Sequence, residues 1–490
     1  MSFKPFSVRC PHIVTVVRAA AFSAAIGVAA SLSVAAEAAP PVKKIGTDFA
    51  VQVDNGWVIY AGSQQNPIFY NTDANPNFAA SKKTKLKTPG ASTDSFFAIG
   101  GIVFAPCPPG HGKCQSSEGS TATGVGLGFG EYLLKGGGGA QSEGGWVSDN
   151  KITAHRTNTD LNPGTITAVA VGTGGAYAVG RDTAPNFTVQ ALVMQLDSAG
   201  QTYVPLHKTF LPPLGGTQSL ATNISKNAVF VTGSADDASG NPHAVYAHVG
   251  DTSWTDLGPK IPAQIEGHAV TKSRALAAND DGIIAGAVTV KEDVAGRTNF
   301  PVDIGFVYNV NTDSMAFFSF PGAEIAPLKV LPGTDVKVIG NLVFVKPKGS
   351  SSTTSAANHP FLFDGSNVTD FLTMTPFGAS QPSFGCRVNR PNNLGEVVGT
   401  CVPDENTTYS DTANATAFYL NTLAASPAYI DINHALHSNE DATIPGIKKY
   451  NFGIASSIDD EDELTLIGLR FVSGNPDQAS FLAVKSAYNP

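Results

Sequence analysis

The chain has 490 residues, of which only 14% are charged, with 50 glycines, 32 prolines and a formal net charge of −9. This composition argues against a helix-rich soluble protein, because such proteins are rich in Glu, Lys and Leu. The acidity argues against nucleic-acid and anionic-membrane partners, which are bound through basic patches.

The first 38 residues are predicted to be an export signal. Three basic residues precede an apolar stretch at 19–36, and Ala36-Glu37-Ala38 fits the small-x-small pattern of a cleavage site. A membrane anchor is the alternative, which the weakly apolar, Ala- and Ser-rich stretch disfavours. Cleavage would change the formal net charge from −9 to −11 and leave a secreted or periplasmic protein. No later segment is long and apolar enough to span a bilayer.

The region 44–150 contains two degenerate copies of a unit made of short apolar runs and turns. The first copy occupies residues 51–70. The second consists of Phe96–Ala105 and Glu131–Leu134, separated by a long insert. Runs of this kind, bounded by turn residues, predict β-strands.

From residue 165 onward the same unit recurs clearly, about every 53 residues. An apolar run closes on a glycine in four copies spaced by 53, 53 and 54 residues and in two looser ones: Gly180, Gly233, Gly286 and Gly340, then Gly399 and Gly468. Turn residues such as Asp280-Asp281-Gly282 precede the run, and β-branched or aromatic residues follow it. Each unit is therefore predicted to form three or four short antiparallel strands.

Units of this size favour a β-propeller. About 50 residues and four strands make one blade, and a single meander must pack on its neighbours to bury both faces. We predict an all-β propeller of six to eight blades, closed by the N-terminal strand, in which residues 39–490 form a single domain almost without helix. The last unit has no room for a fourth strand, so part of Lys44–Val53 is expected to pair with its bare edge.

The repeat resembles the bacterial extracellular repeats called HAF repeats. The residues that carry the resemblance are Asn279–Gly286 with Gly305–Tyr308, Asn392–Gly399 with Ala417–Tyr419, and Asp256-Leu257-Gly258. The resemblance covers roughly residues 165–490 and implies a secreted, propeller-like bacterial protein without implying an activity. The chain departs from the pattern at Leu192-Val193-Met194 and Leu482-Ala483-Val484, which lack the aromatic residue.

Four cysteines remain after the predicted cleavage, and an even number in an exported chain predicts disulfides. Cys386 and Cys401 flank a predicted hairpin with a two-residue loop at 393–394, which places them opposite each other. Cys107 and Cys114 enclose a short loop that one bridge can close.

Catalytic and metal-binding signatures are sparse. No nucleophile elbow, zinc-protease motif or phosphate-binding loop occurs. His111 beside Cys107 and Cys114, or His434 with His437 at i, i+3 spacing, could ligate a metal, but a disulfide loop and surface histidines are the simpler interpretations. The acidic run 459–463 offers oxygen ligands for calcium, although solvated acids are common on such a hairpin turn. We expect no cofactor, with calcium as the alternative.

The long loops give the best indication of a binding face. The connection after the closing glycine takes about 11 residues in the first two clear units and about 18 to 20 in the next three. Insertions at one position of a repeat map to one face, which is often the binding face. Tolerated surface drift is the alternative, because long loops cost little stability. The candidate ligand-binding residues on these loops are Arg297, Asn299, Lys346, Lys348, Asn358, Asn406 and Tyr409.

Two classes of function remain open on the sequence. We expect a monomeric, non-catalytic protein that binds an extracellular carbohydrate or protein through these loops. The alternative is an extracellular hydrolase or lyase, with acid and base residues from different blades meeting in the propeller mouth. Two carboxylates near the axis, or a carboxylate and a histidine, would favour the enzyme. An apolar or merely polar lining would favour the binding protein.

Overall fold

The computed structural model describes 18 stretches of the chain: 42–46, 49–54, 57–61, 67–71, 83–87, 95–106, 114–115, 121–122, 124–135, 141–148, 155–156, 165–186, 188–197, 204–350, 355–374, 384–438, 446–461 and 463–488. The predicted export signal lies outside these residues. So does Cys107, and with it the predicted Cys107–Cys114 bridge.

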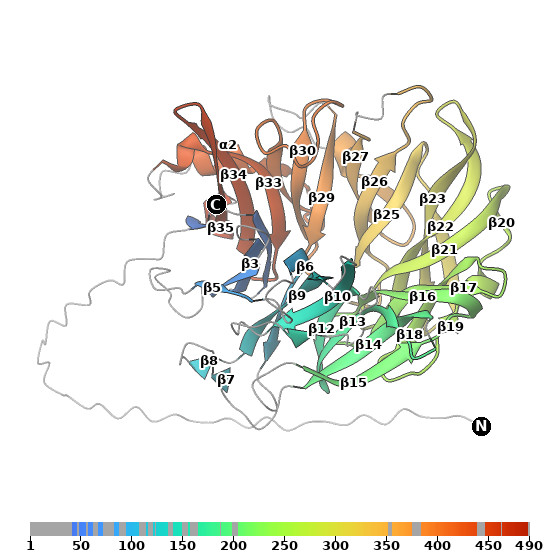
Figure 1. Ribbon diagram of the computed structural model, residues 1–490. Helices are drawn as coiled ribbons and strands as arrows, with labels where there is room; N and C mark the ends of the chain where they lie inside the picture. The colour runs from blue at the N-terminus through green and yellow to red at the C-terminus, as the bar shows by residue number, and fades with distance from the viewer. Residues whose placement is uncertain are drawn as a thin grey trace, which may run out of the picture. The chain divides into compact units, whose positions relative to one another are not determined.

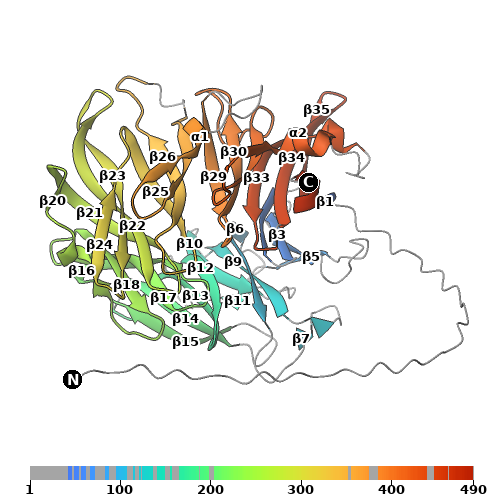
Figure 2. The same ribbon diagram turned by 180° about the vertical axis from the view of Figure 1, so that it is seen from behind.

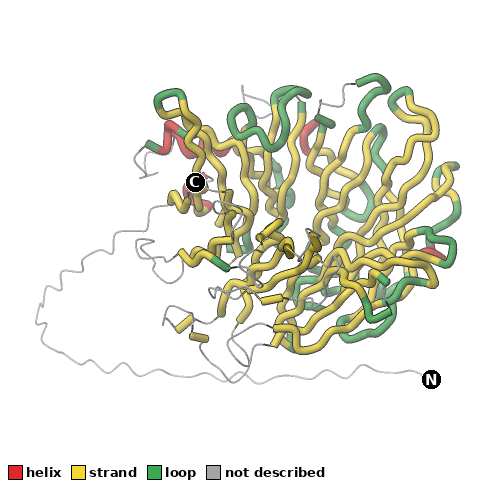
Figure 3. The backbone as a smooth tube through the Cα atoms, in the orientation of Figure 1, coloured by secondary structure: helices red, strands yellow, loops and turns green. Residues whose placement is uncertain are grey.

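The described residues are mainly β-strand, arranged as successive antiparallel sheets (Figure 3). The first strands of the sheets are β2 (Phe49–Asp54), β6 (Ser95–Pro106), β12 (Thr165–Gly172), β16 (Gly215–Ile224), β21 (His268–Ala278), β25 (Ala323–Val330), β29 (Gly385–Pro391) and β33 (Asn451–Ile458). The second strands are β3 (Trp57–Ala61), β9 (Gly124–Lys135), β13 (Gly175–Thr183), β17 (Phe230–Asp237), β22 (Ile283–Val294), β26 (Val338–Phe344), β30 (Glu396–Val402) and β34 (Glu463–Val472).

Two further strands complete each sheet. The third strands are β4 (Pro67–Asn71), β10 (Gln141–Ser148), β14 (Val189–Asp197), β18 (Pro242–His248), β23 (Arg297–Asn309), β27 (Asn358–Phe363), β31 (Thr416–Asn421) and β35 (Asn475–Val484). The fourth strands are β5 (Lys83–Lys85), β11 (His155–Arg156), β15 (Val204–Leu211), β19 (Thr255–Asp256), β24 (Ser314–Phe318), β28 (Val368–Asp370), β32 (Tyr429–Asp431) and, in the last sheet, β1 (Val42–Gly46).

Four-stranded meanders that follow one another in this way, each packing on the next, make a β-propeller (Figure 1). The remaining strands are the short β7 (Cys114–Gln115), β8 (Thr121–Ala122) and β20 (Gln264–Ile265). The described α-helices are short: α1 (Phe371–Met374), α2 (Ile432–Ser438) and α3 (Lys485–Tyr488). Within the described part of the chain, no helix has the length and apolar character needed to cross a membrane.

A β-bulge interrupts every first strand, and it explains the repeated glycine. The strand pairing skips one residue of the first strand, such as Thr222 in β16 or Leu276 in β21. The closing glycine of the second strand, Gly233 or Gly286, faces the residue just before the skipped one. At five closing glycines, a Cβ atom would overlap a backbone carbonyl oxygen of the first strand: Gly180, Gly233, Gly286, Gly340 and Gly399. The glycine is therefore required by close backbone approach.

Gly468, the last of the predicted closing glycines, takes a different place. It faces Phe452, beside an additional bulge of β33. The bulge that corresponds to those of the other sheets skips Ser456, and Leu466 faces the residue before it. The repeat is thus two residues out of step at this point.

Four of the bulged residues also join their sheet to a neighbouring one. Thr222 donates its hydroxyl hydrogen to the carbonyl of Ala275 in β21, at 2.6 Å. Three further side chains donate to a backbone carbonyl in the same way, each at 2.8 Å: Thr167 to Ala221, Asn389 to Ala455 and Ser456 to Ala50. In each case the acceptor is the residue just before the next bulge, so one position of the repeat ties neighbouring first strands together.

The last sheet takes its fourth strand from the beginning of the described chain. β1 pairs antiparallel with β35, with Val42 opposite Ala483. The Lys44 ammonium donates to the Tyr450 hydroxyl at 2.8 Å and lies 5.2 Å from the centre of its ring. The expected segment 44–53 overlaps β1 only at its start, because Phe49–Asp54 is instead the first strand β2. Figures 1 and 2 show the blue strand β3 beside the red strands β33 and β34 from both sides, and β2 contacts the same two strands.

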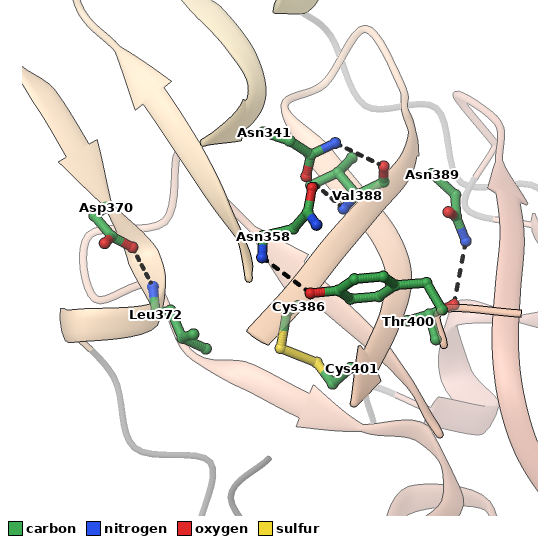
Figure 4. The surroundings of a disulfide bond; sticks show 10 residues. Asn341, Asn358, Asp370, Leu372, Cys386, Val388, Asn389, Thr400 and Cys401 are labelled. Carbon is green, nitrogen blue, oxygen red and sulfur yellow. Dashed lines mark hydrogen bonds between the residues drawn. A yellow bond between two sulfur atoms is a disulfide. The ribbon is translucent and has the colours of Figure 1, made fainter. Parts of the chain in front are cut away.

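The predicted disulfide between Cys386 and Cys401 is present, and both side chains are fully buried (Figure 4). The two residues face each other directly in the β29–β30 pair. The expected two-residue loop is wrong, however. The turn spans Asn392–Glu396, closed by the Asn392 N–H on the Glu396 carbonyl at 2.9 Å. The bulge at Asn389 takes up the extra residue, so the cysteines still meet.

We predict that Gly286→Ala destabilises the protein by about 1–3 kcal/mol, because the added methyl group cannot fit beside the Arg274 carbonyl. Chemical denaturation measures the change. Gly240→Ala is the control: it lies in open space and has a positive φ of 83°, so its cost is the roughly 1 kcal/mol of a strained turn. Equal stability of Gly286→Ala and the parent protein would show that the bulge does not impose this contact.

The double substitution Cys386→Ala, Cys401→Ala should lower the free energy of unfolding by ~3 kcal/mol, because the bridge closes a loop of 15 residues. Peptide mapping without reductant tests the pairing itself. Recovery of either cysteine as a free thiol from oxidised, folded protein would contradict it.

Candidate functional site

The turn between the first and second strands is built alike in several sheets. At Asn279, Asn392 and Asp459, the side-chain Oδ1 accepts the backbone N–H groups two and four residues later, at 2.8–3.1 Å. The Ser225 hydroxyl accepts two N–H groups in the corresponding turn. Such side-chain acceptors fix the turn backbone, so the residues that follow them are presented at the same end of each sheet.

Side chains on these turns bond to the neighbouring turn. Asn227 donates its backbone N–H and its Nδ2 to the Asp280 carboxylate, at 3.0 and 2.9 Å. Asn393 binds Asp460 in the same way, at 2.8 and 2.7 Å. The Lys226 ammonium reaches the same Asp460 carboxylate at 2.6 Å. This ion pair joins the turn after β16 to the turn after β33, although 234 residues separate the two.

A cavity of about 550 Å³ lies among these turns. Residues of β2, β6, β12, β16, β21, β25, β29 and β33 all line it, so the first strands face a common axis. We call it the axial cavity. Its walls carry charges of both signs: Asp54, Lys226, Lys329, Arg390, Asp459, Asp460 and Glu461.

Two cations of the axial cavity have no carboxylate partner among the described residues. Lys329 makes no hydrogen bond or ion pair there, and burial lowers the pKa of its ammonium group. Arg390 binds two neutral oxygens, the Gln52 Oε1 at 2.5 Å and the Gly100 carbonyl at 2.9 Å. Burial also lowers the pKa of Arg390, and the charge of Asp54 opposes that shift.

Two carboxyl groups of the axial cavity have raised pKa values. Burial raises the pKa of Asp54 to about 6, although its carboxylate accepts the Phe104 N–H. Burial, assisted by the charge of Glu463, raises the pKa of Asp459 to about 8. With its proton, Asp459 presents one acceptor and one donor, as Asn279 and Asn392 do in the matching turns.

The predicted loop residues lie elsewhere. Lys346, Lys348, Asn406 and Tyr409 are in connections between second and third strands, whereas Arg297, Asn299 and Asn358 belong to the first residues of the third strands β23 and β27. In an antiparallel meander these connections are at the other end of the sheet from the axial turns. Arg297 donates its Nε to the Lys346 carbonyl at 3.0 Å, and the Lys348 N–H bonds to Ala295 at 3.0 Å. The Asn299 N–H caps a carboxylate of its own hairpin at 2.8 Å. Arg297, Lys346 and Lys348 therefore hold two neighbouring loops together, and Asn299 supports its own hairpin.

The other predicted loop residues form a second group. The Asn358 N–H donates to the Tyr409 hydroxyl at 2.9 Å, and that hydroxyl donates to the Ala356 carbonyl at 3.3 Å. Burial raises the pKa of Tyr409. The Asn406 N–H caps Asp404 at 2.9 Å. Five of the seven residues thus take part in two sets of contacts between loops, while Asn299 and Asn406 bond within their own loops. The role of all seven in ligand binding stays a prediction.

His434 and His437, the histidines considered as metal ligands from the sequence, do not form a pair. Both His434 and His437 belong to α2, but the His437 Nε2 bonds to the Tyr450 carbonyl at 3.0 Å. Among the described residues, no group of three or more His, Cys, Asp or Glu side chains could hold a metal ion. In the acidic run, Asp459 shapes its turn and Asp460 binds Lys226 and Asn393.

Two histidine–aspartate pairs hold third and fourth strands together. The His243 Nδ1 lies 3.0 Å from Asp256, and the His359 Nδ1 lies 2.7 Å from Asp370. They occupy matching positions in two sheets, and neither pair lines the axial cavity. Their repetition and their place indicate a structural role.

Sequence reasoning missed the cations of the axial cavity, although the repeat contains a signal for them. In six sheets the residue just after the bulge lines the cavity, and in four of them it is small or neutral: Gln52, Ala168, Asn223 and Ala277. In β25 and β29 the same position holds Lys329 and Arg390. An alignment of the repeats on the bulge would show two cations in adjacent units.

No protein-family model matches the chain, and neither does any curated protein. Solved structures similar to it include the β-propeller domain of the Trilobed protease from Pyrococcus furiosus, at 9% identity and a TM-score of 0.36, over 77% of this chain and 95% of that one. A Trypanosoma rangeli sialidase complex has 12% identity and a TM-score of 0.35, over 68% and 56% of the two chains. A putative TolB from Agrobacterium tumefaciens has 12% identity and a TM-score of 0.32, over 68% and 92%. At these scores the similarities carry no conclusion about activity.

Asp459→Asn should stabilise the protein, and the gain should grow with pH. The carboxyl pKa is raised from 3.8 to about 8 in the folded state, so folding loses stability as the pH rises through this range. The asparagine cannot ionise. Between pH 5.5 and 8.5 the stability difference between variant and parent should widen by roughly 2–3 kcal/mol, measured by denaturant unfolding at each pH.

Asn279→Asp is the matched control, since it places the titrating group in an equivalent turn. The Asn279 Nδ2 donates to two carbonyls at 2.8 Å, so this variant should lose stability as the pH rises. A pH-independent effect of Asp459→Asn would contradict the assigned role of the Asp459 proton.

Proposed function

We propose that the chain closes into a ring of eight blades, with β1 as the outer strand of the last blade. Eight first strands contribute to the axial cavity. The inter-sheet bond from Ser456 to the Ala50 carbonyl, at 2.8 Å, connects β33 to β2 in the same way that other neighbouring first strands are connected. The Ser480 hydroxyl adds a second bond at this junction by accepting the Ala50 N–H at 2.8 Å. A closed ring leaves no bare strand edge.

We propose further that this ring is an exported ligand-binding protein and that the axial cavity is its site. The observation that carries the proposal is Lys329, a cation on the cavity wall without a hydrogen bond or ion pair to the described residues. Lys329 is half-buried, and a charge drawn partly out of water without a direct partner costs stability. Charged groups held in unfavourable surroundings inside a cleft are typical of functional sites.

A small carbohydrate fits this site better than a protein surface does. The volume of about 550 Å³ is within the range of roughly 300–1,000 Å³ for small-molecule sites. The walls combine charged groups with the rings of Phe104 and Phe129, and a sugar presents both hydroxyl groups and an apolar face. A folded protein could not enter the cavity. Binding here needs no second copy of the chain, in agreement with a secreted or periplasmic monomer.

One observation favours the alternative of a hydrolase or lyase. Asp54 and Asp459 both line the axial cavity and have pKa values raised to about 6 and about 8. Carboxyl groups that titrate near neutral pH can transfer protons in catalysis. Because Asp459 Oδ1 holds the turn of its own hairpin, Asp54 is the candidate general acid.

The axial site is tested by filling it. Val169, which is only partly buried, lines the axial cavity. Val169→Trp should reduce the affinity for a saccharide ligand at least tenfold, because the indole ring occupies the ligand volume. A panel of neutral and acidic mono- and oligosaccharides, measured by calorimetry, identifies the ligand and provides the readout.

Lys348→Ala, in the predicted loop cluster, is the control and should bind as the parent does. Loss of binding in Lys348→Ala with full binding in Val169→Trp would place the site on the loops instead. Release of reducing ends from a bound oligosaccharide, abolished by Asp54→Asn, would establish the enzyme. Binding without turnover supports the binding protein.

A further inference from the structure

We infer that the axial cavity binds an acidic saccharide, and that its carboxylate or phosphate group is held by Lys329 and Arg390. The inference rests on the proposed function and names the ligand class of the same site. Four observations support it. The two cations lie on neighbouring strands of the cavity wall, both have unused hydrogen-bond donors, the nearby acids bind other groups, and Lys329 is unfavourable for the stability of the ligand-free protein.

The two cations lie on neighbouring strands of the wall of the axial cavity. Lys329 follows the bulge of β25, and Arg390 follows the bulge of β29. These strands are the first strands of consecutive sheets and contact each other. Both side chains line the same cavity from neighbouring strands, so one bound saccharide can contact both of them.

Both cations have hydrogen-bond donors to offer. An ammonium has three N–H donors and a guanidinium has five. Lys329 uses none of its donors on the described residues. Arg390 uses Nη1 on Gln52 and Nη2 on Gly100, and these two bonds fix the orientation of the guanidinium plane. A planar guanidinium fixed in this way is suited to a carboxylate or phosphate group.

The acids of the axial cavity are engaged with other groups. Asp460 binds Lys226 and Asn393. Asp459 holds the turn of its hairpin, and Asp54 accepts the Phe104 N–H. Glu461 follows in the same turn as Asp460 and contributes its charge at the mouth. No direct ion pair to Lys329 or Arg390 is formed by any acid among the described residues.

The stability of the ligand-free protein does not explain why residue 329 is a lysine. The preceding sheet has Ala277 at the same position, so the repeat can be built there without a charge. Burial disfavours the ammonium in the free protein more than the charges of Asp460, Asp280 and Asp54 favour it, and an anion bound beside it would reduce that penalty. A residue that costs stability when the cavity is free of ligand and is neutralised by an anionic ligand is expected of a binding site.

The test compares three probes that differ in one group: glucose, glucuronate and glucose 6-phosphate. Calorimetry on the full parent protein should show at least tenfold tighter binding of glucuronate or glucose 6-phosphate than of glucose, because charge-assisted hydrogen bonds are the stronger ones. The relative affinity of the two anions tells carboxylate from phosphate. Lys329→Met should remove the tenfold preference and should leave the melting temperature unchanged or raised.

Lys291→Met, which removes an exposed lysine, is the matched control and should keep the preference. Equal binding of glucose and both anions would overturn this inference while the proposed function stands. Absence of binding to all three probes and to the saccharide panel would overturn both. A lower melting temperature for Lys329→Met would assign the lysine to structure and overturn the inference. If that variant does not fold, Lys329→Gln is measured with the same expectations.

Discussion

In five of the sheets the backbone of the first strand runs so close to the second strand at the bulge that only glycine fits there, and much of the structure depends on this contact. A bulge adds one residue to a strand and changes the direction in which the following side chains point. The bulged residue turns toward the next sheet, where Thr222 and Ser456 find backbone carbonyls. The residue after it turns toward the axis. One irregularity thus supplies both the links between sheets and the lining of the cavity.

This arrangement explains how the axis can carry charge. Lys329, Arg390 and Asp54 all occupy surroundings in which burial disfavours the ionised form. The strands that carry them are held by backbone pairing with their second strands. Side chains of a neighbouring sheet add hydrogen bonds to β2 and β29, from Ser456 and Asn341. Functional groups set on such fixed elements keep their geometry without a ligand. The stability lost at the axis is offset in the layers of apolar side chains between sheets.

The sequence was sufficient to predict the strands, the period and one disulfide, because each depends on local signals. The glycine period marks the bulge, and the turn residues mark the hairpins. These local signals do not predict side-chain direction. A bulge shifts the alternation of side chains between the two faces of a strand by one residue, which moves each following side chain to the other face. The cysteine pair shows the effect, since an unexpected bulge at Asn389 and an unexpected turn length cancelled. Gly468 shows the opposite case, in which an additional bulge displaced the pattern.

The candidate site was harder to predict than the fold for the same reason. Loop length is visible in a sequence and drew attention to residues such as Arg297 and Tyr409, which the structure uses in contacts between loops. Lys329 and Arg390 stand alone within ordinary strand sequences. Their meaning depends on which residue of each strand follows the bulge, and that is known only once strand pairing is known.

The pairing of β1 with β35 has a consequence for the order in which the protein acquires its structure. Val42 of β1 lies opposite Ala483 of β35, 441 residues later, so the first of the described strands finds its partner last. Contacts this distant in sequence are slow to form, because the entropy of closing the intervening chain must be overcome beforehand. Until residues 475–484 have been made, the last sheet lacks its third strand and β1 has no place to dock. The sheets between can form one after another during synthesis, but joining the two ends is a late, post-translational step.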